Sequence, residues 1–234
     1  MTANPIYVAL DRPDLAEALR LAEAVRGHVG GLKVGLEFIT ALGPEGIRRV
    51  MAEGLPVFAD VKFHDIPNTV AGASRALAAL KPAIFNVHAA GGLAMMRAAR
   101  EAAGEGEGRP KVIAVTVLTS LGEGDLAAVG QNGPAVAQVT RLALLAKEAG
   151  LDGVVCSPQE IAAVRAACGP DFLIVTPGVR PAGAALGDQT RVMTPAEAIR
   201  AGADTLVIGR PITAAADPGA AARAIVAEIA GAAV

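Results

Sequence analysis

Pro56-Val-Phe-Ala-Asp-Val-Lys62 is apolar along most of its length and ends on charged side chains. A near-continuous apolar run of this length is typical of a strand that is covered on both faces, as in a parallel sheet. Seven other short aliphatic runs resemble it, at residues 6–10, 31–35, 83–89, 111–119, 153–156, 173–176 and 205–209. The sequence therefore predicts eight buried parallel strands.

The segments between these runs are rich in alanine and have helical spacing. Ser157-Pro-Gln-Glu160 and Thr194-Pro-Ala-Glu197 each combine a hydroxyl N-cap with Pro at the first helical position and Glu at the third. Gly150, Gly169 and Gly202 stand where helices should end. The predicted strands begin about 28 residues apart on average, which is the length of one strand plus one helix.

Eight strand–helix units in 234 residues predict a (β/α)8 barrel, the TIM-barrel fold, formed by residues 1–234 as a single domain. The alternative is a doubly wound open sheet, which normally has a GxGxxG turn after its first strand. Leu10-Asp-Arg-Pro13 follows the first strand here and lacks that pattern. Two longer irregular stretches, 121–132 and 178–191, are expected as loops above the barrel.

The composition restricts the class of function. Hydrophobic residues make up 53% of the chain and aromatic residues only 3%, so the core must be aliphatic and few rings can stack on nucleic-acid bases. The formal net charge of −2 gives no general attraction to nucleic acids or anionic membranes. The chain lacks an apolar run long enough for a membrane span, a signal-peptide pattern and a cysteine motif for zinc. We therefore expect a cytoplasmic protein that binds neither nucleic acid nor a membrane.

Charged side chains stand at the ends of the first three predicted strands, where barrels of this kind build their active sites. They are Asp11, Lys33, Asp60 and Lys62, with Asp65 three residues further on. Period two along a strand points Asp60 and Lys62 to the same side, so we expect the Lys62 ammonium to lie among carboxylates and to stay protonated. Such a lysine can act as an acid but not as a Schiff-base nucleophile. The alternative is a buried ion pair with a purely structural role.

A second signal stands at the ends of the last two strands. Gly209-Arg210 ends strand eight and is followed by a short segment, 211–216, that could form an extra helix. Phosphate sites in these barrels lie after strands seven and eight, and arginine binds such anions with two parallel hydrogen bonds. Arg180 and Gln189, in the loop after strand seven, would complete the site. Isolated surface arginines are usually only solvated, but their convergence here predicts a phosphate ligand.

The motifs together resemble the orotidine 5′-phosphate decarboxylase family. Asp60-Val-Lys-Phe-His-Asp-Ile-Pro-Asn-Thr69 carries the resemblance most specifically. Other segments that match the family occur along almost the whole chain, in the same order as in the family. They are Leu10-Asp11, Leu32-Lys-Val-Gly35, Thr116-Val-Leu-Thr-Ser120, Thr176-Pro-Gly-Val-Arg-Pro181, Gly187-Asp-Gln189 and Val207-Ile-Gly-Arg-Pro211.

The resemblance implies decarboxylation of orotidine 5′-monophosphate to UMP and CO2 in pyrimidine biosynthesis, with no metal or organic cofactor. It implies that Lys62 donates the proton to C6 of the pyrimidine and that Asp60 lies against the departing carboxylate. Family members are homodimers, in which the residues matching Asp65 and Thr69 enter the partner's site. The predicted catalytic residues are therefore Lys62, Asp60, Asp65 and Lys33. The predicted substrate-binding residues are Asp11, Lys33, Asp60, Thr69, Thr119, Ser120, Arg180, Gln189, Gly209 and Arg210. Of these, Asp11 and Lys33 would contact the ribose, and Thr119 and Ser120 would contact the base. Arg180, Gln189, Gly209 and Arg210 would contact the phosphate.

Two alternatives stay open. A related sugar-phosphate decarboxylase or aldolase-like enzyme of the same barrel group would use Mg2+ and an acidic residue at the end of strand two, where this chain has Lys33. An ammonium at that position repels a divalent cation. A phosphate-binding sensor without catalysis would not require Lys62 among carboxylates. His64 and His88 are expected to serve packing or hydrogen bonding, since Lys62 already supplies a proton.

Overall fold

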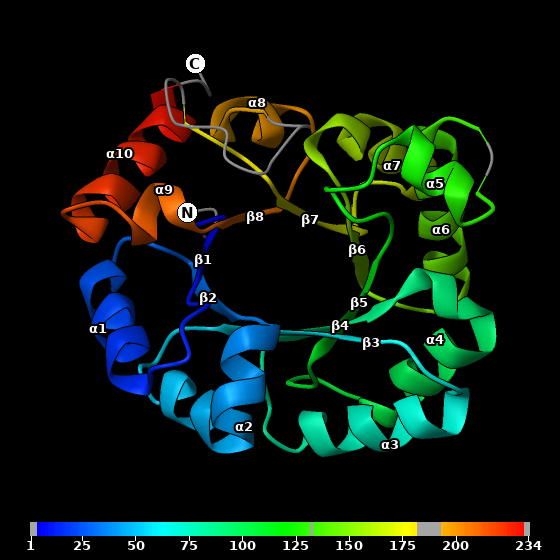
Figure 1. The fold of residues 1–234 in the computed structure, drawn as a ribbon, viewed down its shortest axis with the longest axis horizontal. Coiled ribbons are helices and arrows are strands. Elements are labelled where there is room, and N and C mark those ends of the chain that lie inside the picture. Colours follow the sequence, from blue (N-terminus) through cyan, green and yellow to red (C-terminus); the bar gives the residue numbers. More distant parts are fainter. Residues whose placement is uncertain (1–3, 132, 182–192, 232–234) are drawn as a thin grey trace.

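The computed structural model describes residues 4–131, 133–181 and 193–231. Eight parallel strands form a closed barrel in chain order, in which β8 pairs with β1 (Figure 1). The strands are β1 (Ile6–Ala9), β2 (Gly31–Val34), β3 (Val57–Phe63), β4 (Ile84–His88), β5 (Lys111–Val115), β6 (Gly153–Val155), β7 (Leu173–Pro177) and β8 (Thr205–Ile208). The predicted single-domain (β/α)8 barrel is therefore confirmed.

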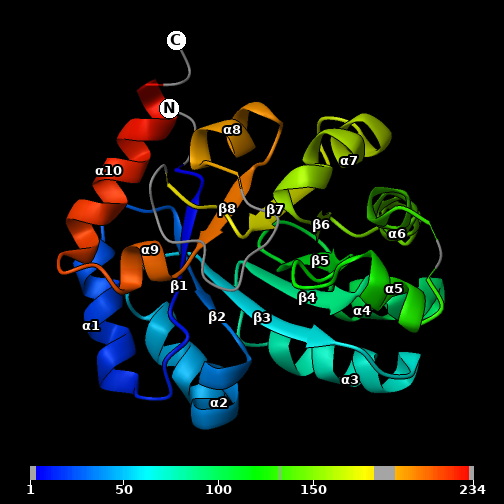
Figure 2. The same ribbon diagram turned by 45° about the horizontal axis from the view of Figure 1, so that its top comes forward.

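Helices surround the barrel. They are α1 (Leu15–Val25), α2 (Leu36–Met51), α3 (Pro67–Ala78), α4 (Gly92–Ala102), α5 (Glu123–Ala128), α6 (Ala135–Glu148), α7 (Ile161–Cys168), α8 (Pro195–Arg200), α9 (Arg210–Thr213) and α10 (Pro218–Gly231), with 3-10 turns η1 (Ala89–Gly91) and η2 (Pro158–Glu160). Figures 1 and 2 both show α10 beside α1, so the last helix closes the ring against the first. Among the described residues, no helix has both the length and the apolar character needed to cross a membrane.

The core has two layers, as a barrel requires. The small inner layer consists of strand side chains that point into the barrel, including Phe58, Ile84, Ile113 and Val175. The larger layer lies between the strands and the helices and consists mainly of Val, Leu, Ile and Ala side chains. The aliphatic composition is thus explained by two close-packed layers with few rings.

The capping signals are confirmed in part. Thr194 accepts the backbone N–H of Glu197, whose carboxylate accepts the N–H of Thr194, so α8 begins with the predicted capping box. Gly169 and Gly202 have positive φ angles of 88° and 109° at the helix ends. Ser157, in contrast, accepts from Gln159 and caps only the 3-10 turn η2, because the helix proper starts later, at Ile161.

Two expected boundaries are wrong. β5 ends at Val115 rather than at residue 119, because its partner β6 has only three residues and the last pair joins Val115 to Val155. The stretch 121–132, expected as a loop, contains α5. The Asp125 carboxylate accepts the N–H of Gly122 at 2.9 Å and so stabilises the first turn of that helix.

An ion pair stabilises the end of the barrel opposite the strand carboxyl ends. The guanidinium of Arg109 donates to the two carboxylate oxygens of Asp152 at 2.8 and 2.6 Å, and the N–H of Val112 donates to the same carboxylate at 2.7 Å. Burial would raise the pKa of Asp152, but these hydrogen bonds outweigh it and hold the pKa below its usual range.

We expect Asp152→Ala to lower the free energy of unfolding by about 2 kcal/mol, because it leaves Arg109 and the Val112 N–H without their acceptor. Because folding lowers the pKa of Asp152, its stabilising contribution is fully present above pH 3.8, the usual pKa of an aspartate side chain. The contribution is lost as the pH falls through the lower pKa of the folded state. Urea denaturation at pH 7 and pH 3 measures both effects. The exposed Asp171→Ala is the matched control, and an equal effect of the two variants would contradict the assignment.

Candidate active site

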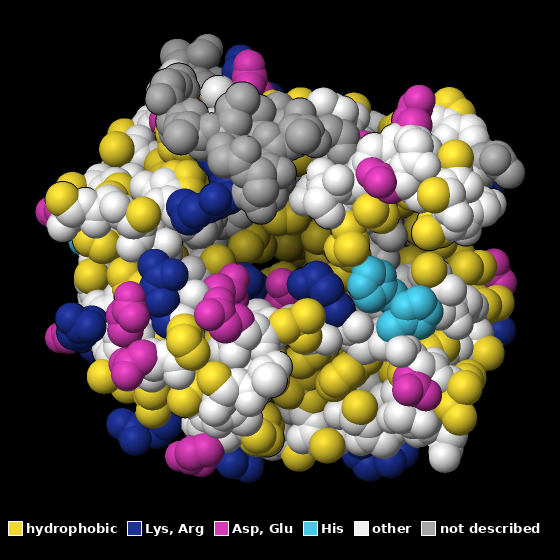
Figure 3. All heavy atoms as spheres, in the orientation of Figure 1, with side chains coloured by type: hydrophobic (Ala, Val, Ile, Leu, Met, Phe, Trp, Pro, Cys, Tyr) yellow, Lys and Arg dark blue, Asp and Glu magenta, His cyan; other side chains and the backbone are white. Residues whose placement is uncertain are grey.

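Four side chains of alternating charge meet at the carboxyl ends of β1, β2 and β3. The Lys33 ammonium lies 2.5 Å from Asp11 and 3.6 Å from Asp60, and the Lys62 ammonium lies 2.5 Å from Asp60. Acidic and basic side chains accordingly lie close together at the hollow in the face shown in Figure 3. The predicted Asp–Lys–Asp–Lys array is therefore present, and each ammonium has a carboxylate partner.

The backbone of β2 and its exit fix the first half of this array. Lys33 is buried, and Asp11 also accepts the backbone N–H of Gly35 at 2.8 Å. A Cβ at Gly35 would lie 2.6 Å from the Asp11 carboxylate and 2.8 Å from the Lys33 ammonium. Glycine at this position therefore leaves the two charged side-chain ends where they lie, whereas a Cβ would displace them.

The second half of the array depends on an irregularity in β3. Ala59 pairs with Phe85 and Phe63 pairs with Val87, so four steps along β3 match two along β4. Within this bulge Lys62 has a φ of 52°, in the left-handed region that non-glycine residues seldom occupy. Bulges of this kind redirect side chains and are common beside active sites.

Asn86, from β4, lies against the bulge. Its side-chain oxygen accepts the backbone N–H of Lys62 at 2.7 Å, and its amide nitrogen donates to Asp60 at 2.6 Å. Burial would raise the pKa of Asp60, but the charges of Lys62 and Lys33 and the hydrogen bonds from Lys62 and Asn86 lower the pKa overall. Asp60 is therefore held as a carboxylate between two ammonium groups.

Two adjoining cavities open from this array. The first, of about 210 Å³, contains Lys33, Asp60, Lys62 and Thr119 and has a largely apolar wall. The second, of about 500 Å³, is lined by Asp11, Glu37 and the arginines Arg12, Arg180 and Arg210. Pro177 and Val207 line both, so the two cavities are neighbours.

The structure brings together most of the predicted site residues. Arg180, Gly209 and Arg210 line the second cavity, and the expected extra helix is α9. Ser120 is exposed beside Thr119, and among the described residues it is not part of either cavity wall. Gln189 lies outside the described residues.

Asp65 and Thr69 lie apart from the array. Both are exposed, and the Asp65 carboxylate accepts the N–H of Ile66 at 2.7 Å. The expectation that Asp65 flanks Lys62 is wrong within one chain, because the described residues include no ion pair between the two. After the bulge the chain turns outward, and Asp65 lines a separate hollow with His64, Ile66 and Pro67.

The two histidine rings lie beside each other at a tilt, near the array rather than within it. The ring centroids of His64 and His88 are 5.5 Å apart. Burial lowers the pKa of His88, and the charges of His64 and Lys62 lower it further despite the opposite effect of Asp60. A neutral His88 is consistent with the expected packing role.

The sequence did not lead us to expect Asn86 in the site, nor a role for Gly35 beside the charged pair. Asn86 is a lone amide in the apolar run Ile84-Phe-Asn-Val-His88, and a polar residue at a fully buried strand position was the available signal.

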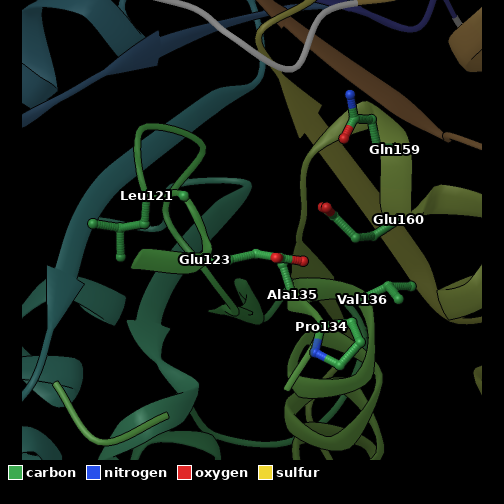
Figure 4. Close-up of a pocket in the computed structure, with 8 residues that line it drawn as sticks. Leu121, Glu123, Pro134, Ala135, Val136, Gln159 and Glu160 are labelled. Atoms are coloured by element: carbon green, nitrogen blue, oxygen red, sulfur yellow. The ribbon is translucent and has the colours of Figure 1, made fainter. Parts of the chain in front are cut away.

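A third cavity, between α5, α6 and η2, contains Glu123, Gln159 and Glu160 but none of the predicted site residues (Figure 4). Among the described residues, no group of three or more His, Cys, Asp or Glu side chains is arranged to hold a metal ion.

Comparison with known proteins decides the family. The protein-family model described as "Orotidine 5'-phosphate decarboxylase / HUMPS family" matches residues 4–225 of this chain. The chain belongs to this family. It is 62% identical over 232 residues to the orotidine 5′-phosphate decarboxylase of Moorella thermoacetica, covering 97% of this chain and 92% of that protein. It is 54% identical to that of Paramagnetospirillum magneticum, covering 97% and 98%.

Solved structures agree with this assignment. The crystal structure of orotidine 5′-phosphate decarboxylase from Lactobacillus acidophilus superposes with a TM-score of 0.83 at 39% identity, covering 97% of this chain and 99% of that one. A structure from Geobacillus kaustophilus described as an uncharacterized conserved protein superposes with a TM-score of 0.84 at 41% identity. The resemblance inferred from the motifs is therefore confirmed at the level of the family and the fold.

Proposed function

We propose that this member of the orotidine 5′-phosphate decarboxylase / HUMPS family converts orotidine 5′-monophosphate to UMP and CO2 in pyrimidine biosynthesis, without a metal or an organic cofactor. The observation that carries the proposal is the Lys62 ammonium, held 2.5 Å from Asp60 in a cavity that adjoins a second one lined by arginines. Relatives named orotidine 5′-phosphate decarboxylase support the same reaction.

The chemistry requires electrostatic stabilisation. Loss of CO2 from C6 breaks a carbon–carbon bond and leaves its electron pair on C6, where no carbonyl group is placed to delocalise it. A fixed ammonium can stabilise that charge as it develops. Lys62 does so and then transfers its proton to C6, and solvent returns a proton to the lysine. Asp60 lies against the departing carboxylate, so their repulsion is relieved as CO2 leaves.

The remaining site residues bind the parts of the substrate that do not react. Asp11 and Lys33 contact the ribose, while Thr119 and Ser120 approach the base. Arg180, Gln189, Gly209 and Arg210 hold the phosphate. Binding energy from the phosphate positions the base at Lys62, which is how a remote group can raise the rate of the chemical step.

The working unit is proposed to be a homodimer in the cytoplasm. Asp65 and Thr69 are exposed, and the neighbouring residue Ile66 leaves 67% of its surface in solvent. This exposed segment is free to make a subunit contact, through which Asp65 and Thr69 would reach the partner's site.

The Mg2+-dependent alternative is disfavoured by charge. A divalent cation prefers a set of oxygen ligands, whereas both carboxylates of the array, Asp11 and Asp60, are already neutralised by ammonium groups. The test is to incubate the purified protein with orotidine 5′-monophosphate and to follow the pyrimidine absorbance and CO2 release. Stoichiometric formation of UMP and CO2 is expected, and an unchanged substrate would contradict the proposed function.

Arg210→Ala should raise KM for orotidine 5′-monophosphate by about tenfold to a hundredfold, because it removes charge-assisted hydrogen bonds to the phosphate. Turnover of the bare nucleoside orotidine should change little. Steady-state kinetics with the two substrates separates these effects, and the exposed Arg200→Ala is the control. Equal losses for nucleotide and nucleoside would remove the phosphate assignment.

A further inference from the structure

We propose that Asn86 is a positioning residue, which holds Lys62 and Asp60 in their reactive arrangement through the two ends of its side-chain amide. The proposal rests on the function proposed above, since it assigns a task to a residue that touches only these two groups of the array. Asn86 is fully buried, so its amide needs protein partners, and the bulge of β3 supplies both.

The first bond explains how Lys62 keeps an unusual backbone. Asn86 is the one residue of β4 between the pairs Ala59–Phe85 and Phe63–Val87, and it therefore faces the bulge. The regular strand ladder is interrupted there, and the Lys62 N–H donates to the Asn86 side chain at 2.7 Å instead. A non-glycine residue at a φ of 52° persists only where its surroundings hold it.

The second bond fixes the carboxylate that faces the ammonium. The Asn86 amide nitrogen donates at 2.6 Å to Oδ1 of Asp60, the same oxygen that accepts from the Lys62 ammonium at 2.5 Å. One amide thus sets the position of the Lys62 backbone and of the carboxylate that orients its side chain. A shift of either would displace the proton donor from the reacting carbon.

The chemistry of the amide is specific. An N–H group must meet an acceptor and a carboxylate must meet a donor, so the two partners determine which end of the amide faces each of them. Aspartate at this position would keep the acceptor for the Lys62 N–H but would place a second carboxylate against Asp60. Leucine would keep the volume and remove both bonds.

The test compares Asn86→Leu and Asn86→Asp with the wild type. We expect kcat to fall by about a hundredfold in both variants while KM changes less than about threefold, because the proposed phosphate contacts stay in place. Val112→Ala, which removes buried atoms on the other side of the barrel wall, controls for a loss of stability. A kcat loss no larger than that of Val112→Ala, or an equal change in KM, would overturn the proposal.

A measurement independent of activity separates this proposal from the proposed function. In the crystal structure of Asn86→Leu, Lys62 should leave the positive φ region and its ammonium should move away from Asp60. Unchanged positions would overturn the positioning role even if the wild type is an active decarboxylase. If the wild type does not decarboxylate, the proposed function fails and this structure still decides the role of Asn86. Should Asn86→Leu not fold, Asn86→Ala removes the same two bonds with a smaller side chain and takes its place in both measurements.

Discussion

Replacing Lys62 with alanine is expected to lower kcat by at least about a thousandfold, while UMP still binds with an affinity within about tenfold of the wild type. The variant loses the ammonium that is proposed both to stabilise the C6 carbanion and to supply its proton. The proposed phosphate ligands Arg180, Gly209 and Arg210 line the second cavity and stay in place. Single-turnover kinetics measures the first quantity and calorimetric titration with UMP measures the second.

Lys111→Ala is the matched control for this experiment, because Lys111 is an exposed lysine at the start of β5. The assigned role of Lys62 would be wrong if the Lys62→Ala variant turned over at a rate near that of the control. A loss of UMP binding as large as the loss of kcat would show that Lys62 acts in binding rather than in the chemical step.

Mixing two inactive variants, Lys62→Ala and Asp65→Ala, is expected to restore about one quarter of the wild-type activity. In the proposed homodimer, random exchange of subunits makes half of the dimers mixed. In a mixed dimer, one site combines the intact Lys62 of one chain with the intact Asp65 of the other, and the second site lacks both. Each variant alone should stay inactive, so the recovered rate reports on the shared site.

Subunit exchange has to be shown separately, for example by the appearance of mixed dimers of differently tagged chains in native mass spectrometry. If exchange is complete and no activity returns, Asp65 does not act across the interface. High activity of Asp65→Ala on its own would likewise remove this residue from the site.

The strands and the charged array could be predicted from sequence because both depend on local pattern. Each strand is a short aliphatic run between helices with marked ends, and closure into a barrel follows from eight such units. Parallel strands in a barrel bring their carboxyl ends together, which is why Asp11, Lys33 and Asp60 could be placed side by side before their distances were known.

The bulge in β3 could not be predicted in the same way. Period two placed Asp60 and Lys62 on one side, but their contact in the structure depends on the left-handed φ of Lys62 and on Asn86. Both features arise from pairing with β4, which starts more than twenty residues later in the chain. The early end of β5 has the same kind of cause, because the short partner β6 limits the ladder.

The array also explains how a chain of almost zero net charge carries a strongly polar site. Its two carboxylates and two ammonium groups balance one another, and Lys33 and Asp60 are each largely shielded from solvent. Buried ion pairs of this kind rarely improve stability over apolar side chains. Their presence at the mouth of the barrel is therefore better explained by catalysis than by folding.

The most direct test of the central claim is the decarboxylation rate of protein from which metal ions have been removed. Lys62 is proposed to supply the stabilising positive charge. Protein treated with EDTA and confirmed metal-free by elemental analysis should therefore convert orotidine 5′-monophosphate with the same kcat as protein supplied with Mg2+. Loss of activity on chelation and its return on adding a divalent cation would contradict the account.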